Sequence, residues 1–353
     1  MGTRRGIARD HVPMRAKLRI PLNKTHLYFR RVTTDMSLIE MLKRRNVLSF
    51  EVYPPKTEAG MDRLCGKGGV LDKLYSLNPD YISCTYGAGG TNVGRNLEVL
   101  QKIAQDGKTI PVTHFTCIGN TRERIREQLD SYLSNGINHL LALRGDLPMG
   151  YTSTGGDLHY AGELVEFVRR EFGNQFTIAV AGSPEGHISC TSLESDIEFL
   201  KRKQDLGADY IMTQLCWDMD QFRRWMDAIR AAGVWLPVDV GIMPILDQKA
   251  TINMALSRNG CVMPRELSVL ISKNWIFPDP FTASPETDTQ YHQKKAAFRE
   301  AGVEYTIEQV RQYRQSGIAG IHLYALNRFE DVAFIAREAG LLGSGGEANR
   351  GGN

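Results

Sequence analysis

The chain has 353 residues, of which 42% are hydrophobic and 24% charged, a composition typical of a soluble globular protein. Its apolar runs are strand-length and interrupted by charge, so they fall short of the roughly 20 residues that span a bilayer, which excludes a membrane-embedded protein. The net charge of +3 includes +7 from residues 1–35, so the rest of the chain is mildly acidic. A mildly acidic body excludes a protein that binds nucleic-acid phosphates.

The cysteines are widely scattered and form no C-x-x-C pair, which argues against a structural zinc site and against a disulfide framework. We therefore expect no metal. Free thiols in a chain of this size indicate a reducing compartment, and we predict a cytoplasmic protein. The six are Cys65, Cys84, Cys117, Cys190, Cys216 and Cys261.

Residues 1–35 are rich in Arg and poor in acid, and we predict a disordered basic arm. A transit peptide is the alternative, although Ser is scarce and no amphipathic period is evident. A start of translation at Met36 is a further alternative. The Gly-rich tail 343–353 is also predicted to be disordered, which leaves 36–342 as the folded domain.

After the arm, Ser37 and Glu40 form a capping-box pattern that opens a short helix through about Arg45. Short runs rich in β-branched and aromatic residues then alternate with amphipathic segments. The runs predicted to be strands are 48–55, 80–88, 110–118, 138–146, 176–185, 210–218, 237–245 and 320–328.

Helix starts lie between these runs. Thr121 opens an amphipathic segment directly after the third run. Hydroxyl or carboxyl residues followed three positions later by Glu or Gln predict further N-caps. These pairs are Thr191 with Glu194, Asp218 with Gln221, and Thr306 with Gln309.

Most strands begin about 30 residues after the previous one, which is the length of a β-strand plus its crossover helix. Apolar strands joined by helices indicate a parallel sheet that is covered on both faces. Eight such units favour a closed (β/α)8 TIM barrel over an open sheet. The spacing breaks between strands seven and eight, where 246–319 is interpreted as a helical insertion on the same barrel.

Polar residues gather where the predicted strands end, and in a barrel the chemistry lies at that rim. Each one alone has an ordinary explanation: an isolated His is more often a core residue, Asn327 and Arg328 suit a strand cap, and Arg144 with Asp146 suits a turn. Their convergence nevertheless predicts a polar ligand site. The rim residues are Thr85, Tyr86, His114, Thr116, Arg144, Gly145, Asp146, Glu185, His187, Gln214, Tyr324, Asn327 and Arg328.

Glu51 lies inside the apolar first strand. Burial disfavours the charged form of a carboxyl, so we predict a raised pKa for Glu51. A carboxyl that holds its proton near neutral pH can act as a general acid. The alternative is a salt bridge to an inward-pointing Arg.

No P-loop or Rossmann glycine pattern is present, since the spacing of Gly87, Gly89, Gly90 and Gly94 suits an ordinary loop. A dinucleotide would have to be held in another way. Asp196 and Lys203 are seven residues apart on one predicted helix and therefore share a face. Ordinary surface charge explains that pair equally well.

Several motifs occur in one order along residues 48–330, and in that order the chain resembles the methylenetetrahydrofolate reductase family in its single-domain bacterial form. The motifs are FEVYPPK (50–56), TYGAGG (85–90), HFTCI (114–118), ALRGDLP (142–148), SPEGH (183–187), DIEFLKRK (196–203), TQLCWD (213–218) and HLYALNR (322–328).

The resemblance implies a barrel that binds FAD noncovalently and reduces 5,10-methylenetetrahydrofolate to 5-methyltetrahydrofolate in one-carbon metabolism. NADH or NADPH would reduce the flavin and leave before the folate binds, a ping-pong cycle. The resemblance further implies a homo-oligomer, and because the chain ends soon after the last strand, no regulatory domain is expected. The choice between NADH and NADPH stays open, since no Rossmann discriminator is present.

The resemblance also implies roles for single residues. Glu51 would be the acid that helps to open the imidazolidine ring of the folate, and Asp146 would lie near both the flavin and the pterin. Gln214 would bind the pterin, with Tyr324 and Arg328 closing that side. The positions that match flavin contacts are Thr85, His114, Arg144, Gly145, Asp146, Tyr160, Ala161, His187, Asp196, Arg202 and Lys203.

Three positions depart from the family pattern. Ser183 stands where an aromatic is common, Phe199 where a polar residue is usual, and Leu215 where many members carry Phe. These departures concern the stacking of nicotinamide and folate and leave the acid and hydride chemistry in place. Two other functions are considered: a pterin-binding methyltransferase barrel without flavin, and an inactive barrel that serves as a scaffold.

Overall fold

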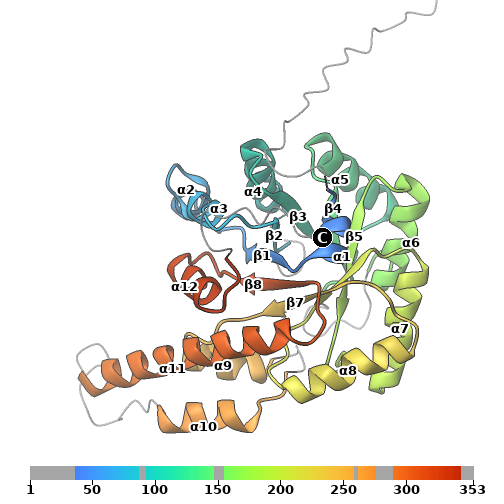
Figure 1. Ribbon diagram of the computed structural model, residues 1–353. Helices are drawn as coiled ribbons and strands as arrows, with labels where there is room; N and C mark the ends of the chain where they lie inside the picture. The colour runs from blue at the N-terminus through green and yellow to red at the C-terminus, as the bar shows by residue number, and fades with distance from the viewer. Residues whose placement is uncertain (1–35, 87–92, 147–154, 258–260, 276–288, 343–353) are drawn as a thin grey trace, which may run out of the picture. The chain divides into compact units, whose positions relative to one another are not determined.

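The computed structural model describes residues 36–86, 93–146, 155–257, 261–275 and 289–342. Within them, eight parallel strands close into one barrel in chain order, which confirms the predicted (β/α)8 TIM fold (Figure 1). The predicted arm and tail lie outside the described residues. The strands are β1 (Val47–Val52), β2 (Tyr81–Cys84), β3 (Ile110–Thr116), β4 (His139–Leu143), β5 (Thr177–Gly182), β6 (Tyr210–Thr213), β7 (Val238–Ile242) and β8 (Gly320–Tyr324).

Each strand is shorter than its predicted run, mainly because the last residues of most runs lie beyond the paired strands, in the loops at the rim. The first and last strands pair with each other, in a register that sets Ser49 opposite His322 and Glu51 opposite Tyr324. Side chains alternate between the two faces of a strand. Ser49 and Glu51 therefore both point into the barrel, whereas Leu48, Phe50 and Val52 pack outward in the main core.

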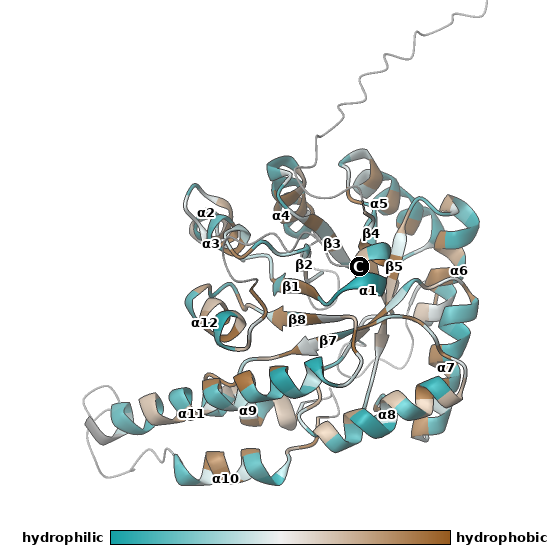
Figure 2. Cartoon of the chain, viewed as in Figure 1, coloured by the Kyte–Doolittle hydropathy of each residue, from teal (hydrophilic) through white to brown (hydrophobic). Residues whose placement is uncertain are grey.

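Helices surround the barrel, and in Figure 2 hydrophilic and hydrophobic residues alternate along most of them, as expected where one face of a helix packs on strands. None of the described helices is long and apolar enough to cross a membrane. The helices are α1 (Leu38–Arg44), α2 (Glu58–Cys65), α3 (Val70–Tyr75), α4 (Val93–Asp106), α5 (Arg122–Ser134), α6 (Ala161–Phe172), α7 (Leu193–Asp205), α8 (Met219–Ala231), α9 (Gln248–Ala255), α10 (Arg265–Lys273), α11 (Thr289–Arg314) and α12 (Glu330–Glu338).

Two of the predicted helix starts are confirmed in full. Ser37 and Glu40 make the complete capping box of α1. Thr121 caps α5 by accepting a hydrogen bond from the backbone N–H of Arg124. Asp218 caps α8 as predicted, but Gln221 donates to the carbonyl of Pro184 and does not complete a box.

The other two starts are wrong. The N-cap of α7 is Ser192, boxed with Ser195, and not Thr191 with Glu194, because two adjacent hydroxyl residues offer registers that differ by one. Thr306 lies inside the continuous helix α11, where its hydroxyl donates to the carbonyl of Gly302 one turn earlier and accepts from the N–H of Ile245. A Thr whose hydroxyl bonds a carbonyl of the preceding turn cannot be distinguished, in the sequence alone, from a Thr that caps a helix start.

Different elements pack at the two ends of the barrel: helix α1 at the N-terminal end, and the insertion at the C-terminal end. Helix α1 packs Leu38, Met41 and Leu42 against inward residues at the N-terminal end of the strands, among them Val47 and Tyr81. The predicted insertion between β7 and β8 consists of α9, α10 and α11, which pack together over residues that follow β6 and β7 (Figure 1). The C-terminal rim is the end that receives the polar residues.

Candidate active site

A cluster of polar side chains fills the barrel interior around Glu51. One Glu51 carboxylate oxygen, Oε2, lies 3.6 Å from His114 Nε2 and 3.8 Å from His322 Nε2. The hydroxyl of Ser83 lies 3.2 Å from His114 Nε2 and 3.1 Å from His322 Nε2. Ser49 completes the cluster, since its Oγ is 2.7 Å from the other ring nitrogen of His322.

The pKa of Glu51 corrects the sequence-based prediction. Burial favours the neutral acid, as expected, but the interaction with the nearby His322 ring and the attraction to His114 outweigh it. The pKa of Glu51 therefore lies below its ordinary value instead of above it. The alternative of an inward Arg is also wrong, because the ion-pair partners of Glu51 are the two histidines.

Burial and the nearby His322 lower the pKa of His114, while Glu51 raises it. The ligand-type atoms of Glu51, His114 and His322 all lie within 4.8 Å of one another, a spacing that would also suit a metal ion. The same two Nε2 atoms also lie within hydrogen-bond distance of the Ser83 hydroxyl.

Three members of this cluster were missed by sequence reasoning: Ser49, Ser83 and His322. A signal for them exists in the two-residue period of a strand. Ser49 lies two residues before Glu51, Ser83 two before Thr85, and His322 two before Tyr324. Each therefore faces the interior one layer below a predicted site residue.

A second, charged cluster lies beyond the ends of β4 and β5. The backbone N–H of His187 donates to Asp196 at 3.2 Å, which ties the loop after β5 to the first turn of α7. Burial lowers the pKa of His187, and Arg144, Lys203 and Asp146 are all within electrostatic reach of its ring. The structure thus brings these five predicted residues together.

Lys203 and Asp196 share the face of α7 that points to the barrel, as their spacing predicted. The ammonium of Lys203 is buried and donates to the carbonyl of Ala181 at 2.7 Å, and burial lowers its pKa. Surface charge is therefore not the explanation for Lys203. Arg202, one residue earlier, is exposed.

One backbone feature beside this cluster suits a phosphate-bearing ligand. Helix α6 begins at Ala161, and its N-cap, Tyr160, makes no side-chain capping bond and is 64% exposed, so the first N–H groups remain available. Such a helix start attracts anions. Gly145 has φ +92°, and a Cβ there would lie 2.5 Å from the side chain of Ile118, so only glycine fits this close approach.

Three further predicted residues lie at strand ends on the rim, namely Thr85, Gln214 and Tyr324, whereas the predicted rim residue Tyr86 is buried in the outer core and donates to Gln128 of α5. The ring of Tyr324 meets His322 edge-on at 6.0 Å, and its hydroxyl lies over Gly241, where a Cβ would come within 2.5 Å. Thr85 follows β2 and its carbonyl accepts from Asn96. Gln214 follows β6, where its backbone N–H donates to the carbonyl of Gly182.

Arg328 lies at the end of a tight turn after β8 and is exposed. In that turn Asn327 has a positive φ of 55°, and its side-chain amide both donates to and accepts from the backbone of Tyr53. The strand-cap alternative thus holds for Asn327, which joins the loops after β1 and β8.

The departures from the family pattern have different surroundings. Phe199 is 54% exposed on α7, whereas Leu215 is buried in the cluster formed with the insertion. Ser183 is partly buried directly after β5.

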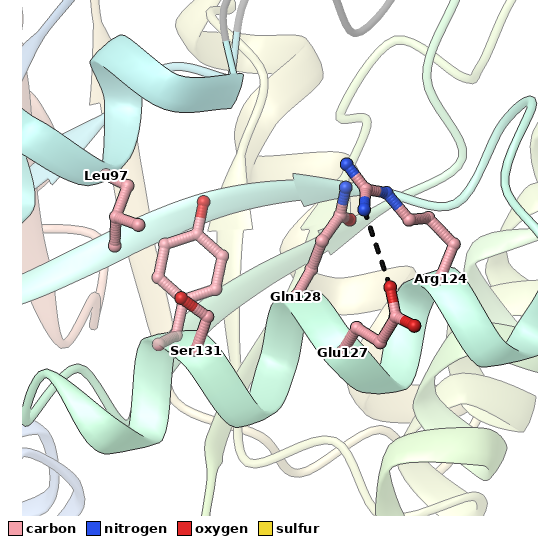
Figure 3. Close-up of a pocket in the computed structure, with 6 residues that line it drawn as sticks. Leu97, Arg124, Glu127, Gln128 and Ser131 are labelled. Carbon is pink, nitrogen blue, oxygen red and sulfur yellow. Dashed lines mark hydrogen bonds and ion pairs between the residues drawn. The ribbon is translucent and has the colours of Figure 1, made fainter.

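A hollow of about 200 Å³ lies elsewhere, between α4 and α5 on the outer helix layer (Figure 3). Its floor is largely apolar, with Leu97 and Tyr132, and an Arg124–Glu127 ion pair of 3.4 Å stands at its edge. No predicted site residue lines it, so it is separate from the rim.

Sequence comparisons agree with the motifs. A family model described as methylenetetrahydrofolate reductase matches residues 37–340. The 5,10-methylenetetrahydrofolate reductase of Pectobacterium carotovorum is 32% identical over 302 residues, which cover 85% of this chain and 92% of that protein. Methylenetetrahydrofolate reductase (NADH) 1 of Arabidopsis thaliana is 32% identical over 312 residues, which cover 84% of this chain and 49% of that protein. The chain spans about half the length of the first curated relatives it matches.

Among solved structures, a protein from Clostridium thermocellum that binds two copies of 5-methyl-5,6,7,8-tetrahydrofolic acid is similar in fold. It aligns over 86% of this chain and 98% of its own, with a TM-score of 0.54 and 13% identity. At that identity the likeness shows the barrel fold alone.

Proposed function

This chain belongs to the methylenetetrahydrofolate reductase family, and from that membership we propose that it reduces 5,10-methylenetetrahydrofolate to 5-methyltetrahydrofolate. The reaction uses noncovalent FAD and NADH or NADPH in a ping-pong cycle. The single observation that carries the proposal is a carboxylate with two imidazole partners, placed in the barrel interior directly below a rim that suits a dinucleotide.

The residues beyond β4 and β5 fit FAD. The exposed N-terminus of α6, at Tyr160 and Ala161, would receive phosphate oxygens through backbone N–H groups. Arg144 adds positive charge. FAD, when bound there, would supply the hydride chemistry between nicotinamide and folate.

His187 and Thr85 flank that site, and Asp196 and Lys203 form its far wall on α7, with Arg202 beside them. Asp146 is exposed between this site and the barrel mouth, where it orients the folate. Gln214 holds the pterin, and Tyr324 and Arg328 close the opposite side of the rim.

Glu51 and its histidines provide the proton. In the open site Glu51 is a carboxylate, because His322 and His114 hold its pKa down. A bound pterin covers the barrel mouth and removes water, which favours the neutral acid. Glu51 then takes a proton from the hydrogen-bonded cluster and delivers it to the ring nitrogen that leaves during opening of the imidazolidine ring.

Absorbance spectroscopy of the purified protein, supplied with FAD, tests the proposal. We expect a flavin band that bleaches under anaerobic NADH or NADPH and returns when methylenetetrahydrofolate is added. A flavin band that bleaches but does not return with methylenetetrahydrofolate would overturn the proposed substrate and indicate a flavoprotein that another substrate oxidises. A protein that binds no flavin would overturn the proposal and favour a folate-binding methyltransferase or a scaffold.

A further inference from the structure

A second carboxyl, Asp239 on β7, is fully buried inside the barrel below the Glu51 cluster. Its Oδ2 accepts a hydrogen bond of 2.5 Å from the hydroxyl of Tyr81, whereas its Oδ1 has no hydrogen-bond partner. Opposite Asp239 in the register is Gly320, where a Cβ would lie 2.7 Å from Oδ1. The absence of a side chain at Gly320 therefore leaves space for the carboxyl of Asp239.

Asp239 reaches the Glu51 cluster through stacked rings. The Tyr81 ring lies parallel to the His322 ring, at 5.3 Å between centroids and 19° between planes. Tyr81 is also paired in register with Ser49, whose hydroxyl contacts His322. Asp239, Tyr81, His322 and Glu51 therefore form a column that runs from the lower layer of the barrel to its mouth.

The charge of Asp239 acts on His322. Burial raises the pKa of Asp239 to about 6, partly offset by attraction to His322 and the hydrogen bond from Tyr81. A buried charge is screened far less than an exposed one. Ionised Asp239 therefore attracts positive charge on the His322 ring from one side of the ring, as Glu51 does from the other.

Other titratable groups face this column from neighbouring strands. Asp80 repels Asp239 but is paired with Arg45 on the surface. The phenols of Tyr81, Tyr210 and Tyr324 face it as neutral groups, because burial raises their pKa values. On the upper side His322 faces Glu51 and His114.

We propose that Asp239 is a positioning residue that sets the proton affinity of the Glu51–His322 pair from the far side of the His322 ring. The inference rests on the proposed function, in which this pair supplies the proton for opening of the folate ring. Asp239 touches neither folate nor flavin and exchanges no proton with them. It keeps the proton on the pair at a pH where the pair alone would lose it.

The kinetic test compares wild type with Asp239→Asn, which keeps the shape and removes the charge. Pre-reduced enzyme is mixed with methylenetetrahydrofolate, and the return of the flavin band is followed across pH. The rate falls where the pair loses its proton. We expect that fall to move to lower pH by about one unit or more in the variant, while flavin reduction by NADH or NADPH is unchanged. Superimposed pH profiles would overturn the inference, and so would an equal loss in both half-reactions.

Tyr210→Phe is the matched control, since it removes a buried hydroxyl from the same layer without removing a charge. Its pH profile should coincide with that of wild type. Tyr81→Phe provides the opposite change, because loss of the hydrogen bond to Oδ2 raises the pKa of Asp239. Asp239 then becomes charged only at higher pH. A Tyr81→Phe pH profile identical to that of wild type would contradict the proposed influence of Asp239 on the Glu51–His322 pair.

A spectroscopic readout does not depend on folate turnover. In protein labelled with ¹⁵N-histidine, the His322 signal, assigned by its loss in His322→Gln, should show an extra inflection near pH 6 that vanishes in Asp239→Asn. If the variant does not fold, a wild-type titration without this inflection overturns the inference. If wild type reduces no folate at any pH, the proposed function fails, and the ¹⁵N titration still decides whether Asp239 acts on His322.

Discussion

Glu51 is partly buried and Asp239 fully buried in the same barrel, and the pKa of Glu51 is lowered while that of Asp239 is raised. The difference lies in their partners. Glu51 is surrounded by two imidazoles that can carry positive charge. Asp239 has one hydrogen-bonding phenol, an oxygen without a hydrogen bond, and an attraction to His322 that does not outweigh burial. Burial alone therefore does not predict the direction of a pKa shift.

Glu51→Gln isolates the acid from the rest of the site. Gln keeps the shape and can still bond the histidines, but it cannot deliver a proton. We expect flavin reduction by NADH or NADPH to be retained and folate reduction to fall about 10²- to 10⁴-fold, measured by the two halves of the flavin absorbance cycle. Glu185→Gln is the control, because Glu185 is a partly buried carboxyl that bonds the N–H of Val262 on the insertion. Normal folate reduction by Glu51→Gln would remove Glu51 from the acid role.

The raised pKa of Asp239 also has a cost in stability. The folded-state value of about 6 exceeds the ordinary 3.8, so the folded protein holds the proton more tightly than the unfolded chain. Stability from this group is full below pH 3.8 and is lost as the pH rises through about 6. Asp239→Asn should raise the free energy of unfolding by about 3 kcal/mol at pH 8, with little gain at pH 4. Urea unfolding at both pH values measures this, and a variant less stable than wild type at pH 8 would contradict it.

At the scale of elements, the sequence was sufficient for the order and type of the strands and for the position of the insertion. The strand pattern at 48–55 or 320–328 is formed by residues that are adjacent in the chain, so the sequence alone shows it. The helix starts at Thr191 and Thr306 were misplaced because a hydroxyl can bond either a following N–H or a preceding carbonyl. Asp239 and His322 went unnoticed because their roles depend on strands that meet only in the closed barrel.

The contact between the insertion and the barrel depends on a glycine. A Cβ at Gly302 of α11 would lie 2.2 Å from the carbonyl oxygen of Ile245, which follows β7. Gly302→Ala must push α11 away, and we expect a loss of about 1–3 kcal/mol in the free energy of unfolding. Gly94→Ala is the matched control, because nothing lies within 4 Å of a Cβ at that helical position. It should be neutral or stabilising by up to about 1 kcal/mol. Equal effects in chemical denaturation would show that the Gly302 contact is not tight.

At the scale of the whole molecule, the residues assigned to FAD come from β3, the loops after β2, β4 and β5, and the helices α6 and α7. Such a ligand binds only when these elements are assembled. FAD should therefore stabilise the fold by about 2.7 kcal/mol at a concentration 100 times its Kd, seen as a thermal midpoint that rises with FAD. Lys203→Met, which removes a buried ammonium of the site, should weaken this rise. A midpoint that does not respond to FAD would contradict the assignment.

The pairing of β1 with β8 also determines when the acid becomes functional during synthesis. Ser49 and His322 are 273 positions apart, so ribosomes that add about 5–20 residues per second need tens of seconds to supply the second after the first. In that interval Glu51 exists without His322, and the edges of β1 and of the newest strand are open. A nascent chain that stops before β8 therefore already contains every residue assigned to FAD. It also contains Glu51, but it lacks the His322 ring that lies beside Glu51 in the finished barrel.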